Sequence, residues 1–216
     1  MGRSLRIGTW NLNVGWNARK REFLEAQGCD VWLLTEVPDK ALPDLPAAVV
    51  SQHRMARRQW YAALASWLPV QPVVAPHGAS AAGCIEGVRV VASVLPWRGS
   101  AAGAPWVGSG LRERFVNTID AIAAGIDETT VWGGDWNQTM AGANNGGTVA
   151  GRTAIEGLLA RTRLELPTRA LPHRLTGLHA IDHIALPATW TVRNAARVKA
   201  DGMSDHDAYL VDFACS

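Results

Sequence analysis

The stretch TTVWGGDWN, residues 129–137, is an apolar run that ends in a turn carrying Asp135 and Asn137. A continuous run of this kind, rich in Val and Trp and closed by polar residues, predicts a buried strand. Polar side chains at the end of such a strand stay accessible, whereas polar side chains in its middle would be buried and would need partners. The end of this strand is therefore a candidate functional position.

The same pattern recurs along the chain. It is found in TWNLN (9–13) with Asn11 and Asn13, LLTEV (33–37) with Glu36, and AIDHIAL (180–186) with Asp182, and SDHDAY (204–209) opens the last predicted strand with Asp205 and His206. If these segments lie side by side, their polar groups meet at one rim of the molecule. The set contains many oxygen donors and one candidate imidazole, which suits Mg²⁺ or Mn²⁺ better than zinc.

Two spacings bear on the geometry of this rim. Asp135 and Asn137 are two residues apart, so in an extended segment both side chains would point the same way. Asp205 and His206 are adjacent and would point apart in a strand, but a turn at residues 202–204 can bring both to one site. His183 alternates with Asp182, and we expect it to be a structural histidine on the opposite face of its strand.

Length and composition favour one globular domain over residues 1–216. With 48% hydrophobic and 19% charged residues, the chain is not of the disordered type. It has no uncharged apolar run of about 20 residues, so no membrane span is expected. Three cysteines without metal-finger spacing indicate neither zinc nor disulfides, which favours a reducing, cytoplasmic location. We expect a monomer.

Predicted strands and helices are interspersed along the whole chain. Helices are expected over 18–27, with Asn17 as the N-cap, over 110–124 and over 150–161. An α/β layered sandwich follows from this order. The expected strands are 5–11, 30–37, 47–52, 60–67, 70–75, 88–95, 129–137, 179–186, 190–198 and 207–213.

In this order, the motifs TWNLN, LLTEV, GGDWN, IDHI and SDH resemble the endonuclease/exonuclease/phosphatase (deoxyribonuclease I-like) superfamily, over residues 7–213. That superfamily includes deoxyribonucleases, abasic-site endonucleases, inositol-polyphosphate phosphatases and neutral sphingomyelinases. The resemblance implies a four-layer α-β-β-α sandwich, a single domain of two packed mixed sheets flanked by helices. It also implies a hydrolase of phosphodiester bonds that depends on Mg²⁺ or Mn²⁺.

The resemblance also implies a role for each motif residue. The implied metal ligands are Glu36, with Asn11 beside it, and Asp205; Asp135 would orient or deprotonate the attacking water, Asn137 would hold the phosphate or the water, and His206 would contact the phosphoryl oxygen with Asp182 fixing its tautomer. Asn13 stands where relatives often have Asp. Ser93 stands where relatives often have His or Tyr, and Arg98 is a candidate to replace that donor. Asn13, Ser93 and Arg98 are further candidate metal or phosphate contacts.

The substrate is left open by the sequence. A nuclease acting on DNA or RNA is favoured by the bias toward arginine, since only three of 21 basic residues are lysines. Five tryptophans near the motifs can stack on bases or fill the core: Trp10, Trp16, Trp97, Trp106 and Trp136. The alternatives are a phosphatase or phosphodiesterase acting on a small-molecule or lipid-type phosphate ester, and a non-catalytic binding module. The net charge of +2 neither requires nor excludes a polyanionic partner.

Overall fold

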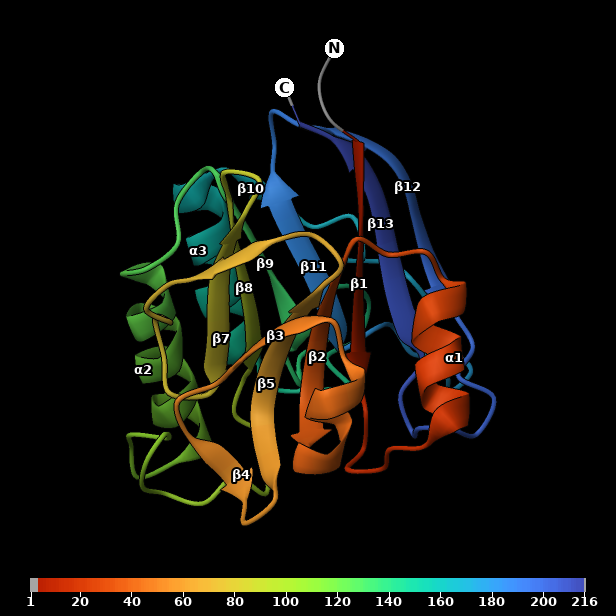
Figure 1. Cartoon of the computed structure of the whole chain (residues 1–216). Helices are drawn as coiled ribbons and strands as arrows, with labels where there is room; N and C mark the ends of the chain where they lie inside the picture. Colours follow the sequence, from red (N-terminus) through yellow and green to blue (C-terminus); the bar gives the residue numbers. More distant parts are fainter. Residues whose placement is uncertain (1–3, 216) are drawn as a thin grey trace.

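The computed structural model describes residues 4–215, and in it two β-sheets pack face to face (Figure 1). The first, sheet A, is built around β1 (Ser4–Asn11), which pairs in parallel with β2 (Val31–Pro38) and antiparallel with β13 (Ala208–Ala214). Outward from these strands, sheet A continues with β5 (Gln59–Ser66), β3 (Ala47–Val50), β4 (Arg54–Ala56) and β12 (Thr191–Val198).

The second sheet, sheet B, has β9 (Thr130–Asp135) near its centre. This strand pairs in parallel with β8 (Val88–Val94) and antiparallel with β11 (Asp182–Pro187). The rest of sheet B is β7 (Ser80–Ile85), β6 (Val70–Pro72) and the short β10 (Leu164–Glu165). Both sheets are mixed.

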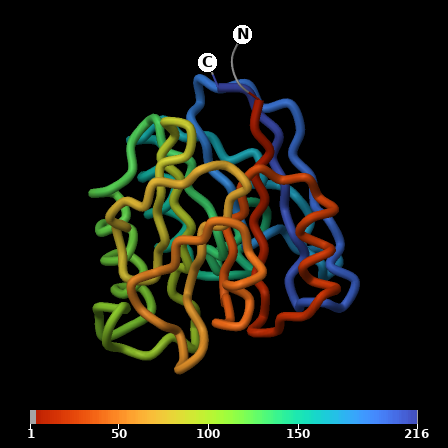
Figure 2. Tube along the Cα trace, viewed as in Figure 1, coloured from red at the N-terminus to blue at the C-terminus, as the bar shows by residue number. Residues whose placement is uncertain are grey.

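Helices cover the outer face of each sheet (Figure 1). On one side, α2 (Leu111–Ala123) and α3 (Val149–Thr162) cover sheet B. On the other, α1 (Ala18–Ala26) covers sheet A, and the short 3-10 helix η1 (Asp39–Asp44) follows β2. The layers are therefore α-β-β-α, as the family resemblance implies. Both ends of the described chain lie at one edge of the sandwich (Figure 2).

Strand alternation builds the three larger hydrophobic cores of the described residues from these layers. In β2, Leu33 packs between the two sheets, whereas Trp32 and Leu34 pack beneath α1 and η1. In β9, Val131 lies between the sheets and Trp132 packs against α2 and α3. Each central strand is therefore buried on both faces, which explains why these strands are continuous apolar runs in the sequence.

The predicted elements agree with the structure apart from some of the short ones. The side chain of Asn17 caps α1 as expected by accepting a hydrogen bond from the Lys20 N–H, 3.0 Å. The elements absent from the prediction are β4, β7, β10 and η1. β7, with the sequence SAAGCI, is rich in Ala and Gly, which are weak strand formers, so its apolar alternation is faint. None of the helices described is long and apolar enough to cross a membrane.

Gly133 allows the two sheets to approach closely. A Cβ atom at this position would collide with the backbone oxygen of His183 and would lie 2.6 Å from Leu33 Cδ1. We expect Gly133→Ala to lower the free energy of unfolding by about 1–3 kcal/mol, because either a strand or the facing sheet must shift. Urea denaturation followed by tryptophan fluorescence measures this change.

Gly157→Ala, within α3, is the matched control, since a Cβ built there meets only the end of the Arg161 side chain, at 3.5 Å. The free energy of unfolding of this control should not fall, because Ala is favoured over Gly in a helix by about 1 kcal/mol. Equal effects of the two substitutions would contradict the close approach at Gly133.

Candidate functional site

The polar ends of the central strands face one another across the space between the sheets. On β1, Ile7 packs between the sheets, and Asn11, four residues further along the strand, points to the same inter-sheet face because side chains alternate. On β9 and β11, Asp135 and Asp182 are paired neighbours that share a face with residues of the same inter-sheet core. We call this polar end of the inter-sheet space, formed by Asn11, Glu36, Asp135, Asp182 and His206, the seam.

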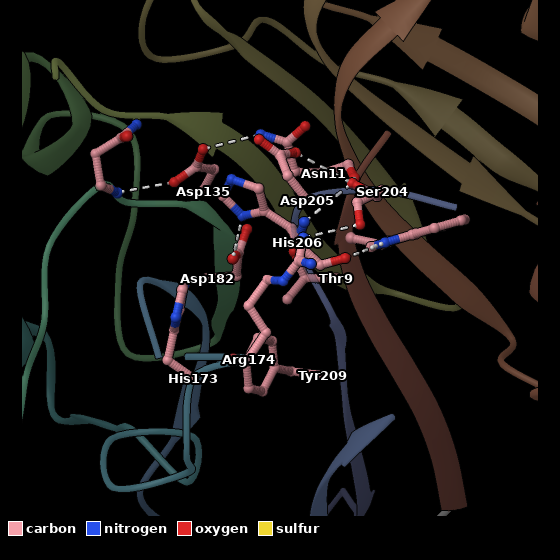
Figure 3. Close-up of polar contacts among 12 residues, drawn as sticks. Thr9, Asn11, Asp135, His173, Arg174, Asp182, Ser204, Asp205, His206 and Tyr209 are labelled. Carbon is pink, nitrogen blue, oxygen red and sulfur yellow. Dashed lines mark hydrogen bonds and ion pairs between the residues drawn. The ribbon is translucent and has the colours of Figure 1, made fainter. Parts of the chain in front are cut away.

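Asn11 connects the two sheets at the seam (Figure 3). Its side-chain amide donates hydrogen bonds to Asp135 Oδ2, 3.0 Å away in sheet B, and to Glu36 Oε1, 3.1 Å away in sheet A. Its Oδ1 accepts from the backbone N–H of Asn13 at 2.8 Å. Asn11 therefore presents amide protons to the carboxylates, and Asn13 contributes through its backbone while its side chain is exposed.

Glu36 reaches the seam because of an unusual backbone conformation. Leu34 and Val37 both pack beneath α1, although two residues three positions apart in a regular strand point to opposite faces. The reversal occurs at Glu36, which has φ 50°, in the left-handed region that non-glycine residues rarely adopt. Conformations of this kind cost about 1–3 kcal/mol and cluster at functional sites. Gln59 Nε2 also approaches the Glu36 carboxylate, at 3.4 Å.

A second connection between the sheets joins His206 to Asp182. His206 Nδ1 is 2.7 Å from Asp182 Oδ2, and the Asp182 side chain is 1% exposed. The other oxygen, Asp182 Oδ1, is buried and has no hydrogen-bond partner among the described residues. With Nδ1 engaged, Nε2 is the remaining donor of His206. Ligand atoms of Asp135, Asp182 and His206 all lie within 4.8 Å of one another.

Ser204 holds the turn that carries His206, and the sequence analysis did not single it out. Its hydroxyl donates to the backbone oxygen of Asn11 at 2.7 Å and lies 3.5 Å from Asp205 Oδ1. It also accepts from the backbone N–H of His206 at 3.1 Å. The turn thus brings Asp205 and His206 to the end of β1, as the sequence predicts, and Figure 3 shows this group. The available signal was the Ser-x-His spacing, which permits a serine turn.

The expectation that Asp135 and Asn137 point the same way is wrong. β9 ends at Asp135, and the chain then turns, with φ 50° at Asn137. The Asn137 backbone N–H donates to Asp135 Oδ1 at 2.9 Å, which is a turn closed by an Asp side chain. The Asn137 side chain instead donates to the backbone oxygen of Leu95 at 3.0 Å. It therefore ties the end of β9 to the chain beyond β8.

Ser93 and Arg98 are not part of the seam. Ser93 lies on the helix-facing side of β8, where its hydroxyl contacts the Ser80 hydroxyl at 2.8 Å and accepts from Trp132 Nε1 at 3.2 Å. Strand alternation explains this placement, because its neighbour Ala92 faces the other sheet. Arg98 is exposed on the turn that follows Leu95, and no hydrogen bond joins it to the seam residues.

The tryptophans near the motifs belong mainly to the core. Trp10 and Trp136 are fully buried, and Trp16 and Trp106 are nearly so. Trp97 is partly exposed and packs edge-on against Trp106, with ring centroids 6.0 Å apart. Of the two roles left open for these five residues, core packing holds for four.

Burial and charge set the protonation of the seam. Burial and the adjacent Asp182 carboxylate raise the pKa of Asp135 to about 7, although His206 and two hydrogen bonds oppose the rise. Burial disfavours the charged form of His206, but the charge and hydrogen bond of Asp182 outweigh it and raise the pKa of His206 to about 10. At neutral pH, His206 is therefore a cation and Asp135 is near its midpoint.

The seam has a donor set that fits a hard divalent cation. Its carboxylates come from Glu36, Asp135, Asp182 and the neighbouring Asp205, and no lysine or arginine forms an ion pair with any of them in the described part of the chain. The charge of Glu36 is uncompensated, because this carboxylate meets only amide donors. Asp182 pairs with His206 through Oδ2, and its Oδ1 has no partner among the described residues. Oxygen atoms with uncompensated negative charge are the ligands that Mg²⁺ and Mn²⁺ prefer.

The fold is that of known phosphoesterase structures. The chain is similar to an endonuclease/exonuclease/phosphatase from Beutenbergia cavernae DSM 12333, with TM-score 0.71 and 18% identity over 99% of this chain and 72% of the other. It is also similar to an AP endonuclease from Archaeoglobus fulgidus, with TM-score 0.70 and 15% identity over 96% and 98% of the two chains.

A third similar structure is the 3'-5' exonuclease NExo from Neisseria meningitidis, with TM-score 0.69 and 17% identity over 98% of this chain and 100% of the other. No protein-family model matches the sequence, and no curated protein matches it significantly. These likenesses confirm the predicted endonuclease/exonuclease/phosphatase-type fold.

His183 lies on the opposite face from Asp182, as predicted, and makes the native state sensitive to acid. It is fully buried between Thr168 and the Gln138 carbonyl, and burial lowers its pKa to about 4. The unfolded chain binds this proton near pH 6.5, so the contribution of His183 to stability is complete above that pH and is lost as the pH falls toward 4. Between pH 7 and pH 5 the expected loss is about 2 kcal/mol.

Urea unfolding of the wild type and of His183→Asn at pH 7 and pH 5 isolates this contribution, since the other titrating groups are common to both proteins. In the variant, the free energy of unfolding should not show the fall of about 2 kcal/mol between pH 7 and pH 5 that is assigned to His183. An identical pH dependence of the two unfolding free energies would show that His183 does not titrate in this way.

Proposed function

We propose that this protein is a divalent-metal-dependent phosphodiesterase that acts on nucleic acid. The observation that carries the proposal is the buried Asp182–His206 ion pair, which lies with Asp135 at the end of the seam beside Glu36 and Asn11. This arrangement combines a fixed cation, a carboxylate that titrates near neutrality and an oxygen-rich ligand set. These three elements can position the attacking water and neutralise the charge that develops on a reacting phosphate ester.

His206 is positioned to bind a phosphoryl oxygen. Asp182 accepts a hydrogen bond from Nδ1–H of His206, which fixes the orientation of the charged imidazole. The Nε2–H of His206 is then left to donate to the substrate. A hydrogen bond from a cation to the oxygens of the reacting phosphate neutralises charge that grows in the transition state.

Asp135 is the candidate to orient and deprotonate the attacking water. Its Oδ2 is held by Asn11 and its Oδ1 by the backbone of Asn137, so the carboxylate is fixed in orientation. A base with a pKa near 7 balances its deprotonated fraction against its basicity at neutral pH. Asn137 serves this arrangement through its backbone and by anchoring the turn to Leu95.

Glu36 and Asp205 are the candidate metal ligands, and Asn11 remains a predicted third ligand. A bound Mg²⁺ or Mn²⁺ would supply Lewis-acid neutralisation of the phosphate charge. Asn11 Oδ1 accepts from Asn13, so the structure favours a positioning role in which the Asn11 amide orients Glu36 and Asp135.

Nucleic acid is the favoured substrate class. Among the similar proteins are AP endonucleases, and a Neisseria 3' phosphatase in complex with a product DNA hairpin. In this chain, Arg57 and Arg58 are exposed on the hairpin between β4 and β5, where they can meet a phosphate backbone. We further infer a reducing, cytoplasmic location, because the number and spacing of the three cysteines in the sequence fit neither a zinc site nor a disulfide framework. The monomeric state remains a prediction.

The metal requirement is tested with bis-p-nitrophenyl phosphate, single- and double-stranded DNA, RNA, and p-nitrophenyl phosphate. We expect hydrolysis of bis-p-nitrophenyl phosphate and of at least one nucleic acid with Mg²⁺ or Mn²⁺, and no hydrolysis with EDTA. If p-nitrophenyl phosphate, the monoester, were the only substrate hydrolysed, the proposed activity would be that of a phosphatase and not that of a nuclease. Activity that survives EDTA would contradict the metal assignment.

The assigned roles are tested with Glu36→Gln, Asp182→Asn and His206→Asn. Each should lower kcat by about 10²–10³-fold, because each removes a charge that acts on the reacting phosphate or holds the group that does. Glu22→Gln is the matched control, since Glu22 is an exposed carboxylate on α1.

Circular dichroism of each variant verifies the fold, and Mn²⁺ titration followed by electron paramagnetic resonance measures binding. Glu36→Gln should weaken Mn²⁺ binding more than His206→Asn does. Full activity of Glu36→Gln or His206→Asn would overturn the assignment of the seam as the active site.

A further inference from the structure

A cleft of about 510 Å³ adjoins the seam on the side of Ser204. Its walls are the loop 172–177, the end of β12 and the turn that leads to His206. The charged and titratable lining residues are His173, Arg174, Arg197, Lys199, Asp201 and Asp207. Positive charge therefore gathers beside a seam that is built of carboxylates.

Two cations of the cleft have no carboxylate partner in the described chain. Arg174 donates only to the backbone oxygen of Ser204, at 3.1 Å, and no hydrogen bond or ion pair engages Lys199. Arg197 is neutralised by Asp207, 3.0 Å away, whose other oxygen accepts from the Ala200 N–H. The remaining acid, Asp201, is exposed on the turn. The cleft thus keeps a net positive charge and two accessible donor groups.

The loop that carries Arg174 is held in place. Tyr209 Oη donates to the Pro172 oxygen at 3.1 Å, and Arg197 Nη1 donates to the His173 oxygen at 2.6 Å. The His173 N–H closes the loop on the Leu178 oxygen at 2.9 Å. These bonds fix the cleft before any ligand arrives, which lowers the entropic cost of binding.

Ser204 joins the cleft to the seam. It lines the cleft, and its hydroxyl accepts from the N–H of His206. Figure 3 shows His173 and Arg174 on the Asp182 side of His206, close to Tyr209. A substrate whose reacting phosphate contacts His206 can therefore place a neighbouring anionic group in the cleft.

We propose that this cleft binds a second phosphate of the substrate, adjoining the phosphate that is cleaved. The proposal rests on the proposed function and narrows its substrate class to chains with at least two neighbouring phosphates. Guanidinium and ammonium donors without carboxylate partners are the groups that bind phosphate in proteins. The second phosphate is either an internal diester or a terminal monoester, and the experiment separates these sources.

The test compares kcat/KM for bis-p-nitrophenyl phosphate and for three thymidine oligomers. TpT has a single phosphate, TpTpT adds a neighbouring diester, and pTpT adds a terminal monoester. The wild type should prefer TpTpT or pTpT to TpT by about tenfold or more, and the preferred oligomer identifies the source of the second phosphate. Lys199→Gln should reduce that preference by about tenfold.

Arg193→Gln is the matched control, because it removes one exposed positive charge from the other end of β12 and should keep the wild-type preference. The absence of a preference in the wild type would overturn the proposal, as would an equal loss for all substrates in Lys199→Gln. In the latter case Lys199 would act only on the general field or on the fold.

A binding measurement separates this proposal from the proposed function. Thymidine 3',5'-bisphosphate is titrated by calorimetry in EDTA, where no hydrolysis is expected. Affinity that falls about tenfold in Lys199→Gln but not in Arg193→Gln supports the cleft even if no substrate is hydrolysed. Equal affinity of the wild type and the two variants for thymidine 3',5'-bisphosphate would overturn the proposal that the cleft binds a phosphate, and would leave the hydrolase assignment intact.

Discussion

The buried pair of carboxylates at the end of sheet B is the constraint on which the site depends. Asp135 and Asp182 are paired residues of adjacent strands and are almost fully removed from water. Two like charges in such a position strongly disfavour each other unless compensated. Compensation comes from the opposite side of the seam: the Asn11 amide of sheet A donates to Asp135, and the His206 cation, on the turn before β13, pairs with Asp182. Neither sheet could hold its half of the site alone.

The separation of charge beside the seam gives a sharper meaning to the small net charge of the chain. The total of +2 conceals an acidic seam and a basic cleft that meet at Ser204. A divalent cation in the acidic part and a phosphate in the basic part each find the opposite charge. Such a division orients a charged ligand more strictly than a uniform surface would.

The layered fold and the membership of the seam could be predicted because both follow from short-range patterns. The central strands are continuous apolar runs because they are buried on both faces. Strand alternation alone places His183 on the opposite face from Asp182. Two local backbone conformations could not be predicted. The left-handed conformation of Glu36 reverses the alternation of β2 and brings this predicted site residue to the seam. At Asn137 the chain turns, so the expectation of an extended segment is wrong.

Other features depend on contacts between distant parts of the chain. Ser204 acquires its role only by meeting the Asn11 carbonyl, 193 positions away in the sequence. The position of Ser93 follows from the alternation of side chains along β8, which places Ser93 against Trp132 and away from the seam. No local pattern in the sequence distinguishes these outcomes, since they are set by the register and packing of whole strands.

The two hydrogen-bonded bridges across the inter-sheet space have a consequence for the dynamics of the molecule. Asn11–Asp135 and His206–Asp182 each join one sheet to the other, at distances of 3.0 and 2.7 Å. Separation of the sheets by even about an ångström would break both, since hydrogen bonds weaken steeply beyond their normal length. The reacting groups therefore belong to the same cooperative unit as the inter-sheet core, and this part of the site cannot open locally without the opening of the sandwich itself.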